Sequence, residues 1–367
     1  MDKKKILIVS KAFYPMIAPR SFRATELAKE FAKQGHNVTV LTHKRKYDYT
    51  NLEKKYDLKV EDFVHNKWKE LKGKNILTKL LHFILNYLFL FPDIQLTPLL
   101  KNTLKKKKGF DLLISIAVPY PIHWGVALAK KNNQYLCKTW VADCGDPFMG
   151  DKERRYKYPV YFHIIENWFC KKPDYITIPI KEAIKAYPKK CRDKVIVIPQ
   201  GFNFNEITYL NNRSNNINNP YPIFIYAGSL SKEFRNPNNL LKYLSSLSNK
   251  KFKFIIYTNN DIIDYRFKLE LGDKLEIHEY VPREELMMEL IKANFVLNFE
   301  NKNEEHSPSK LIDYALLKKP ILSINTDNIN IKLINEFLNG NYSNQFIVKN
   351  IDEYNIKNVV EKFLKLI

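Results

Sequence analysis

Short apolar runs recur along the first half of the chain, with segments of helical spacing between them. Residues 6–9 are continuously apolar, as expected for a strand covered on both faces. Between Ala24 and Phe31 the apolar residues fall at i, i+3, i+4 and i+7, which is one face of a helix. Further strands are predicted at residues 38–41, 110–117, 138–142, 175–178 and 195–198, and a helix from Lys181. Alternating strands and helices predict a parallel sheet.

A second alternating series follows residues 199–203, which look like a connection between domains, and an Asn-rich stretch that predicts an exposed loop. Its predicted strands are 223–227, 252–257, 275–278, 295–299 and 321–324, and its predicted helices are 239–247, 283–292, 308–317 and 352–366. We therefore expect an α/β protein with two Rossmann-like domains, residues 1–199 and 200–350.

Length and charge narrow the classes of function. A chain of 367 residues is too long for one ordinary core and suits two domains. The formal net charge of +21 indicates contact with nucleic acid, an anionic membrane or anionic substrates. The sequence contains no recognisable motif of a nucleic-acid-binding module, so nucleic acid is not an expected partner. The four cysteines lack metal-clip or disulfide-framework spacing, and no signal-peptide core follows Met1, so we expect a cytoplasmic protein.

The charge is concentrated around an apolar run at residues 76–92. Between His65 and Lys108 there are ten lysines and two acids. The run is short for a membrane span, which needs about 20 apolar residues. A helix of this kind flanked by lysines is able to lie in the headgroup region of an anionic bilayer. A buried helix of the first domain, with a solvated lysine rim, explains the same pattern, and the sequence leaves both interpretations open.

The segment from Glu305 to Asp313 carries the most informative chemistry, because two acids stand eight positions apart with a helix start between them. Ser307 is a good N-cap residue and the proline after it suits the first helical position. The free amides of Ser309, Lys310 and Leu311 would then point away from the helix, in the arrangement that binds phosphate. An ordinary capped helix with surface acids is the alternative.

This segment and the run that follows it resemble the E-x7-E element of retaining glycosyltransferases of the two-domain GT-B fold, in particular glycosyltransferase family 4. Asp313 stands where the family has its second glutamate, and Lys318 where a glycine is usual. The resemblance implies a nucleotide-sugar donor as substrate, with no metal and no cofactor. It also implies that Glu305 steers the sugar, that Asp313 holds the ribose hydroxyls, and that residues 351–367 cross back onto the first domain.

Two further segments of the second half point to the donor. Gly228 directly follows a predicted strand, where a glycine lets a ligand approach the backbone, and Arg235 follows with a forked set of donors suited to phosphate. The family's "G-x-L-x-x-x-R/K" segment, which these residues resemble, binds the donor diphosphate. Tyr280 begins a run similar to "G-x-V-P-x-E-E-L", which tends to lie against the nucleobase. Its ring would either stack on the base or pack in the core.

In the first domain, the loop after the first strand lacks the two glycines that relatives often have, so Arg20 or Arg23 would supply charge there or simply lie on the helix surface. Asp143 and Asp146 belong to a run similar to "W-V-A-D-x-R-D-P-W", in which Gly145 stands where relatives carry arginine. The two carboxylates would orient an acceptor or donor hydroxyl, or serve as loop caps. His123 would face the cleft from a helix start or be structural.

We therefore interpret the chain as a metal-independent retaining glycosyltransferase that assembles capsule, O-antigen or exopolysaccharide. Its acceptor would be a lipid-linked glycan, and the enzyme would be peripheral at the inner face of the cell membrane. Two rivals remain: a nucleotide-sugar 2-epimerase on the same fold, and a non-catalytic, membrane-associated sugar-nucleotide binder or assembly partner.

Overall fold

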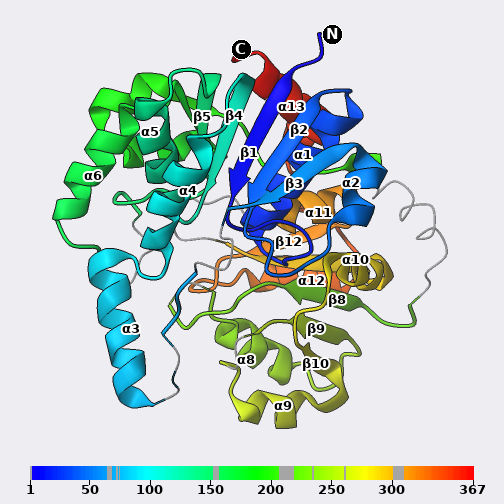
Figure 1. The fold of residues 1–367 in the computed structure, drawn as a ribbon. Coiled ribbons are helices and arrows are strands. Elements are labelled where there is room, and N and C mark those ends of the chain that lie inside the picture. Colours follow the sequence, from blue (N-terminus) through cyan, green and yellow to red (C-terminus); the bar gives the residue numbers. More distant parts are fainter. Residues whose placement is uncertain are drawn as a thin grey trace. The chain divides into compact units, whose positions relative to one another are not determined.

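The computed structural model divides the chain into two compact units (Figure 1). Unit 1 comprises Met1–Phe202 and Ile356–Ile367, and unit 2 comprises Asn203–Asn355. The structure describes residues 2–63, 68–71, 73, 75–151, 157–205, 219–233, 235–259, 262–300 and 310–367. The first change of unit thus falls after Phe202, where the sequence indicated a connection at residues 199–203.

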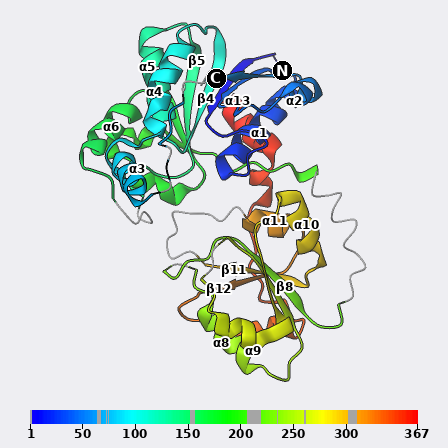
Figure 2. The same ribbon diagram turned by 60° about the horizontal axis from the view of Figure 1, so that its bottom comes forward.

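Unit 1 is built on a seven-stranded parallel sheet in the order β3-β2-β1-β4-β5-β6-β7 (Figures 1 and 2). The strands are β1 (Lys5–Ser10), β2 (Asn37–Thr42), β3 (Leu58–Asp62), β4 (Phe110–Ala117), β5 (Cys137–Cys144), β6 (Tyr175–Ile178) and β7 (Val195–Val197). The helices are α1 (Pro19–Lys33), α2 (Thr50–Tyr56), α3 (Ile76–Phe89), α4 (Leu96–Leu104), α5 (Pro121–Asn132), α6 (Tyr161–Cys170) and α13 (Ile356–Leu364), with short 3-10 turns η1 (Asp93–Gln95), η2 (Lys181–Ala186) and η3 (Lys189–Lys194).

Helices cover both faces of this sheet. One core cluster joins the strands to α4, α5 and α6, and the other joins them to α1 and α13. The last helix, α13, buries Val359, Val360 and Phe363 and packs against α1, so the chain end belongs to unit 1. Edge strand β3 escaped prediction because only Leu58 and Val60 of its five residues are apolar and buried, so it forms no apolar run.

Unit 2 contains a five-stranded parallel sheet in the order β10-β9-β8-β11-β12. The strands are β8 (Ile223–Ala227), β9 (Lys253–Tyr257), β10 (Leu275–His278), β11 (Phe295–Phe299) and β12 (Ile321–Ile324). The helices are α8 (Asn238–Ser246), α9 (Tyr265–Leu271), α10 (Arg283–Lys292), α11 (Lys310–Leu316) and α12 (Ile331–Leu338), with 3-10 turns η4 (Gly272–Lys274) and η5 (Ile351–Tyr354). Figure 2 shows α8 and α9 on one face of the sheet and α10 and α11 on the other.

The strand orders also indicate where ligands bind. In both sheets the order reverses direction at one position, between β1 and β4 in unit 1 and between β8 and β11 in unit 2. Open parallel sheets bind ligands outside the carboxyl ends of the strands at such a point. The loops that follow β1, β4, β5 and β8 are therefore the first places to look for a site.

The apolar run at residues 76–92 forms α3, and the buried interpretation of it is wrong. No residue of this helix is buried, and Ile76 and Leu77 at its start are 82% and 72% exposed. The buried helix of this region is α4, in which Leu96, Leu100 and Leu104 are fully buried. Within the described part of the chain no single helix could cross a bilayer, and only α3 taken together with Asp93–Leu104, at a bend of 47°, passes the length and composition test.

The lysine run that follows α4 lies away from α3. The Lys108 carbonyl accepts a hydrogen bond from the ammonium of Lys5, the first residue of β1, so this run is at the amino edge of the sheet. The other end of α4 is at the carboxyl edge, because Asp93 pairs with Lys11, which directly follows β1. The lysines at 105–108 and the apolar helix are thus separated by the length of α4, contrary to the expectation that they form one surface.

Candidate functional site

The carboxyl end of β8 is shaped by a glycine. Gly228 has φ of +152°, and a Cβ built there would lie 3.1 Å from the Tyr226 hydroxyl oxygen and 3.5 Å from the Lys310 Nζ. A larger residue would push into both groups. The Tyr226 hydroxyl in turn donates to the Ser229 carbonyl at 2.9 Å, which holds the loop against the buried ring. A ligand that approaches the backbone at Gly228, as the sequence predicts, would therefore meet the Lys310 ammonium.

That ammonium is buried, and no acid among the described residues pairs with it. The Lys310 Nζ lies 4.0 Å from the centroid of the Tyr226 ring and has no hydrogen-bond partner among the residues that the structure describes. Burial, reinforced by the positive charge of Arg235, holds the pKa of Lys310 well below its usual range. A buried cation with no partner is unfavourable unless a ligand anion pairs with it.

Arg235 adds a second cation to this place. An antiparallel bridge between Ser231 and Arg235 folds the loop back on itself, and the Arg235 Nη1 donates to the Ser229 hydroxyl at 3.2 Å. Gly228, Arg235 and Lys310, predicted from segments far apart in the sequence, are therefore brought together. Two cations beside a glycine backbone suit a diphosphate, which carries closely spaced negative charges.

Tyr280 lies at the edge of the same cluster. Its side chain is 46% exposed, so the alternative that it packs in the core is wrong. Burial of its inner part raises the pKa of Tyr280, and a hydrogen bond with Ser229 and the charge of Arg235 counter that shift. The backbone N–H of Tyr280 donates to the Asn259 side chain at 3.1 Å, which fixes the loop. A half-exposed aromatic side chain thus lies beside the two cations.

Asp313 has a partner that the sequence did not identify. Its Oδ1 accepts a hydrogen bond of 2.7 Å from Arg283, the first residue of α10. Burial raises the pKa of Asp313, and the charge and hydrogen bonds of Arg283 partly offset that effect. A carboxylate has about four acceptor positions, so it retains room for ribose hydroxyls. The side chain of Leu311 is 8% exposed and packs in the core of unit 2, leaving only its amide for a ligand.

Three predicted site residues, Glu305, Ser307 and Ser309, lie outside the described residues. The amide cradle and the sugar-steering carboxylate expected of them therefore remain predictions. The described part of α11 starts at Lys310, directly after them.

In unit 1, Asp143 is a buried structural partner of Arg23 rather than an open carboxylate. It is 3% exposed, and its two oxygens accept from the Arg23 Nε and Nη2 at 3.1 and 2.9 Å and from the Thr177 hydroxyl at 2.8 Å. Burial favours the neutral acid, but the charge of Arg23 holds the pKa of Asp143 below its ordinary value. Arg23 also donates to the carbonyls of Ile198 and Pro199, so the pair joins α1 and β5 to the chain that leaves unit 1. The predicted contact of Asp143 with substrate is thus corrected.

His123 is a second correction. Its ring is fully buried and stacks on Phe169. The Trp140 indole donates to the Ser115 hydroxyl at 2.8 Å, and that hydroxyl shares a hydrogen bond with the His123 Nδ1, also at 2.8 Å. Burial lowers the pKa of His123 to about 3, which keeps the ring neutral. A neutral ring inside the core does not face a cleft, and the structural alternative is correct.

The Arg20 guanidinium lies against Gly145, the residue that replaces the arginine expected from the sequence resemblance. A Cβ built on Gly145 would lie 1.7 Å from the Arg20 Cζ, so the guanidinium lies directly over this glycine. The cation therefore comes from the start of α1 and needs the absence of a side chain at 145. Asp146 follows at a partly exposed position, and its carbonyl accepts from the Tyr120 hydroxyl at 2.8 Å. Arg20 and Asp146 are the predicted unit 1 residues that remain accessible at the carboxyl edge.

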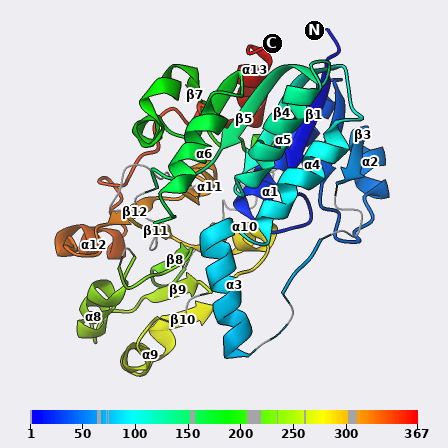
Figure 3. The same ribbon diagram turned by 60° about the vertical axis from the view of Figure 1, so that its left-hand side comes forward.

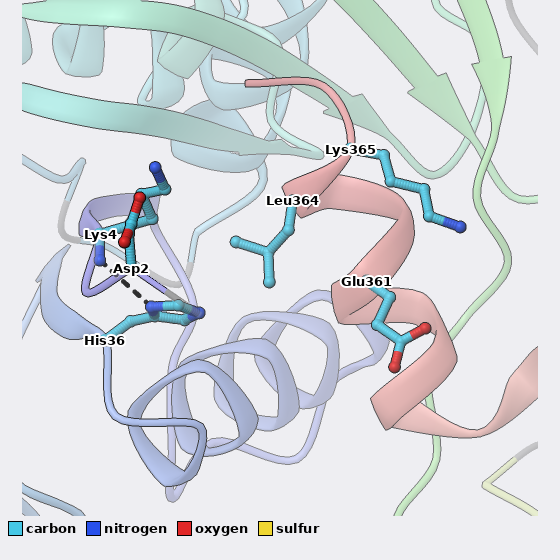
Figure 4. A pocket seen from close by; sticks show the side chains of 6 residues that line it. All are labelled: Asp2, Lys4, His36, Glu361, Leu364 and Lys365. Atoms are coloured by element: carbon cyan, nitrogen blue, oxygen red, sulfur yellow. Dashed lines mark hydrogen bonds between the residues drawn. The ribbon is translucent and has the colours of Figure 1, made fainter.

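A cavity of unit 1 lies away from these residues. It has a volume of about 310 Å³ and is lined by Asp2, Lys4, His36, Glu361, Leu364 and Lys365 (Figure 4). These residues precede β1 and β2 or end α13, so the cavity is at the amino edge of the sheet. Among the described residues no group of three His, Cys, Asp or Glu side chains could hold a metal ion.

Comparison with solved structures shows the fold. The crystal structure of a glycosyltransferase from Rickettsia africae ESF-5 superposes with a TM-score of 0.58 at 14% identity, over 100% of this chain and 93% of the other. The apo form of the lipopolysaccharide outer core galactosyltransferase WaaB superposes with a TM-score of 0.56 at 13% identity, over 98% of this chain and 95% of the other. The S. aureus MnaA–UDP co-structure superposes with a TM-score of 0.52 at 13% identity, over 99% of this chain and 98% of the other. The chain thus has the GT-B fold of two Rossmann-like domains.

No curated protein matches the sequence. Residues 210–366, which span unit 2 and the last helix, match the family model described as glycosyl transferases group 1. The segment that holds Gly228, Arg235 and Lys310 is therefore similar to glycosyltransferases of that group.

Proposed function

We propose that this protein is a retaining glycosyltransferase that binds a nucleotide sugar on unit 2 and transfers the sugar to a lipid-linked glycan. The observation that carries the proposal is the buried ammonium of Lys310 beside Gly228 and Arg235, which has no partner among the residues that the structure describes. The match of residues 210–366 to glycosyl transferases group 1 supports it, because that match covers the same residues. A UDP molecule is named in the MnaA co-structure, so UDP is a sensible first ligand.

The chemistry follows from where negative charge develops. The bond between the anomeric carbon and the diphosphate oxygen breaks, and its electron pair leaves with the diphosphate. Lys310 and Arg235 stabilise that charge, which lowers the barrier in the way preorganised cations do. The acceptor hydroxyl bonds to the anomeric carbon on the face from which the diphosphate departs, and its proton passes to the leaving phosphate oxygen. No metal and no cofactor take part, and Glu305 steers the sugar.

The acceptor belongs to cell-surface polysaccharide assembly: a glycan on a lipid diphosphate, at the inner face of the cell membrane. The net charge of +21 supports an anionic surface as the place of action. Arg20 over Gly145 and the neighbouring Asp146 are the accessible polar groups on unit 1 for this substrate.

A thermal-shift panel of nucleoside diphosphates, followed by transfer assays with the matching nucleotide sugars, tests the proposal. A ligand that binds only the folded state raises the unfolding midpoint. Proton NMR of the product gives the anomeric configuration, and inversion would refute the retaining mechanism. Conversion of a nucleotide sugar without acceptor would indicate an epimerase instead. Glu305→Ala should fold yet lose turnover, whereas a non-catalytic binder would show no turnover to lose.

A further inference from the structure

Exposed apolar side chains are concentrated on α3. Its side chains Leu80, Phe83 and Phe89 are 54%, 49% and 55% exposed, in addition to the residues at its start. Figures 1 and 3 show this helix leaving the body of unit 1 beyond the start of α4. Its carboxyl end is anchored in unit 1: Leu90, which follows the helix, is buried in the core, and the Tyr161 hydroxyl donates to the Leu88 carbonyl. Soluble proteins rarely leave an apolar patch of this kind uncovered without an interaction partner.

The sequence of α3 is arranged for a surface between water and lipid. At about 100° per residue, Thr78, Lys79, His82 and Asn86 fall within roughly 100° of arc. Apolar and aromatic side chains occupy the rest of the circumference, with Phe89 alone entering the polar arc in the last turn. Asn75 caps the first turn by accepting a hydrogen bond from the Thr78 N–H at 2.8 Å, which stabilises the start of the helix.

The helix is too short to span a bilayer. Fourteen residues rise about 21 Å, against about 30 Å of hydrocarbon. The neighbouring α4 supplies no second half, because Leu96, Leu100 and Leu104 are fully buried in the core of unit 1. An orientation in the plane of the interface remains.

The apolar surface continues onto the start of α6. Val160, Tyr161 and Ile164 are 80%, 41% and 72% exposed, and Tyr161 contacts the end of α3. Together with α3 these residues form what we call the α3–α6 surface. Aromatic side chains with a polar tip, such as Tyr161, favour the boundary between headgroups and acyl chains.

Positive charge predominates in the sequence of α3 and of the segment before it. Helix α3 contains no acid, and the only acid of α6, Glu166, is buried. The sequence just before α3 contributes four lysines and one acid between positions 67 and 74, and Lys79 lies in the polar arc. Positive charge beside an uncovered apolar face complements an anionic bilayer, and it disfavours a second copy of the same positive surface.

We propose that the α3–α6 surface inserts among the headgroups and upper acyl chains of an anionic lipid bilayer, with the lysine run after α4 playing no part. The base of α3 is at the carboxyl edge of the unit 1 sheet, since Asp93 pairs with Lys11 there. Insertion therefore brings that edge, with Arg20 and Asp146, next to the membrane surface. This last consequence, access to a lipid-linked acceptor, rests on the proposed function, whereas the insertion itself does not.

Co-sedimentation of the full chain with phosphatidylcholine vesicles, with and without phosphatidylglycerol, tests the proposal. The variant carries Leu77→Gln, Leu81→Gln and Ile84→Gln, which remove apolar surface without changing charge. We expect binding to the mixed vesicles to fall at least about tenfold. The matched control carries Lys105→Gln, Lys106→Gln and Lys108→Gln, three exposed lysines at the amino edge, and should bind nearly as well as the parent.

Equal binding of the parent and the apolar variant would overturn the proposal, and so would loss of binding in the lysine control alone. A parent that ignores vesicles but forms a dimer, with the apolar variant monomeric in light scattering, would assign the surface to a second copy instead. All three proteins are also tested for the nucleoside-diphosphate thermal shift. If vesicle binding follows this pattern and no nucleotide shifts the parent, the proposed function fails while the α3–α6 surface stands.

Discussion

Replacing Lys310 by methionine should make the protein more stable and less able to bind its donor. Methionine keeps the length of the side chain but removes a cation that is buried, unpartnered among the described residues and close to Arg235. The substitution loses a cation–π contact with Tyr226 that contributes about 0.5–2 kcal/mol. It also removes the cost of a desolvated ion, which is several kcal/mol. We expect a net gain of about 1 kcal/mol, or about 2–4 °C in the unfolding midpoint.

The effect on binding should be much larger and of opposite sign. A phosphate oxygen about 4 Å from the ammonium interacts with it by about 4 kcal/mol at an effective dielectric constant near 20. Allowing for screening by solvent and by Arg235, affinity for the nucleoside diphosphate should fall by about 10²- to 10³-fold. Differential scanning fluorimetry measures both quantities, the midpoint without ligand and the shift that the ligand produces.

Lys319→Met is the matched control. The Lys319 ammonium donates to the carbonyls of Ile291 and Ala293 at the end of α10, with a distance of 2.7 Å to the second. Its removal leaves those carbonyls without a charged donor, so the midpoint should fall while the ligand shift persists. The reasoning is refuted if Lys310→Met is less stable than the parent and still responds fully to the diphosphate.

Three further changes test unit 1. Gly145→Ala places a Cβ where the Arg20 guanidinium lies, so the rate of sugar transfer should fall about tenfold with little change in stability. An unchanged rate would show that Arg20 does not contribute to transfer. Asp143→Leu leaves Arg23 buried without its partner, and urea denaturation should show a loss of about 3–5 kcal/mol; unchanged stability with lost turnover would restore a catalytic role. Burial raises the pKa of Glu166 from 4.5 to about 7, so the folded state binds more protons and stability falls as pH rises from about 4.5 to 7, by at most about 3 kcal/mol. Glu166→Gln should flatten that pH dependence of the unfolding midpoint, and a slope equal to that of the parent would contradict the assignment.

Local pattern predicted most of the strands because each is a short apolar run between loops. Strands β4, β6, β8, β10, β11 and β12 and helix α10 have the bounds that the sequence predicts. The pattern failed for β3, whose edge position leaves part of it open to water. Gly228, Arg235 and Lys310 were named singly from their segments, and the contact among them required the sheet to bring β8 and α11 together.

The polar residues of unit 1 show why the rest was out of reach. Asp143 and His123 look like cleft residues in the sequence, since each stands at the end or start of an element. Whether such a side chain meets solvent depends on the residues that pack against it. Arg23 from α1 pairs with Asp143, and Phe169 from α6 stacks on His123. The sequence does place Arg23 on the face of α1 that is turned toward the sheet. That position identifies no partner for Arg23 until the order of the strands is known.

The amphipathic pattern of residues 76–92 is the clearest case of this division. The sequence by itself determined that a helix forms there and which side chains share a face, because both follow from spacing within one segment. A buried helix and a membrane-surface helix have the same spacing. Only the tertiary structure decided that α4 takes the place in the core and leaves α3 uncovered, because burial is a property of the neighbours that surround a segment.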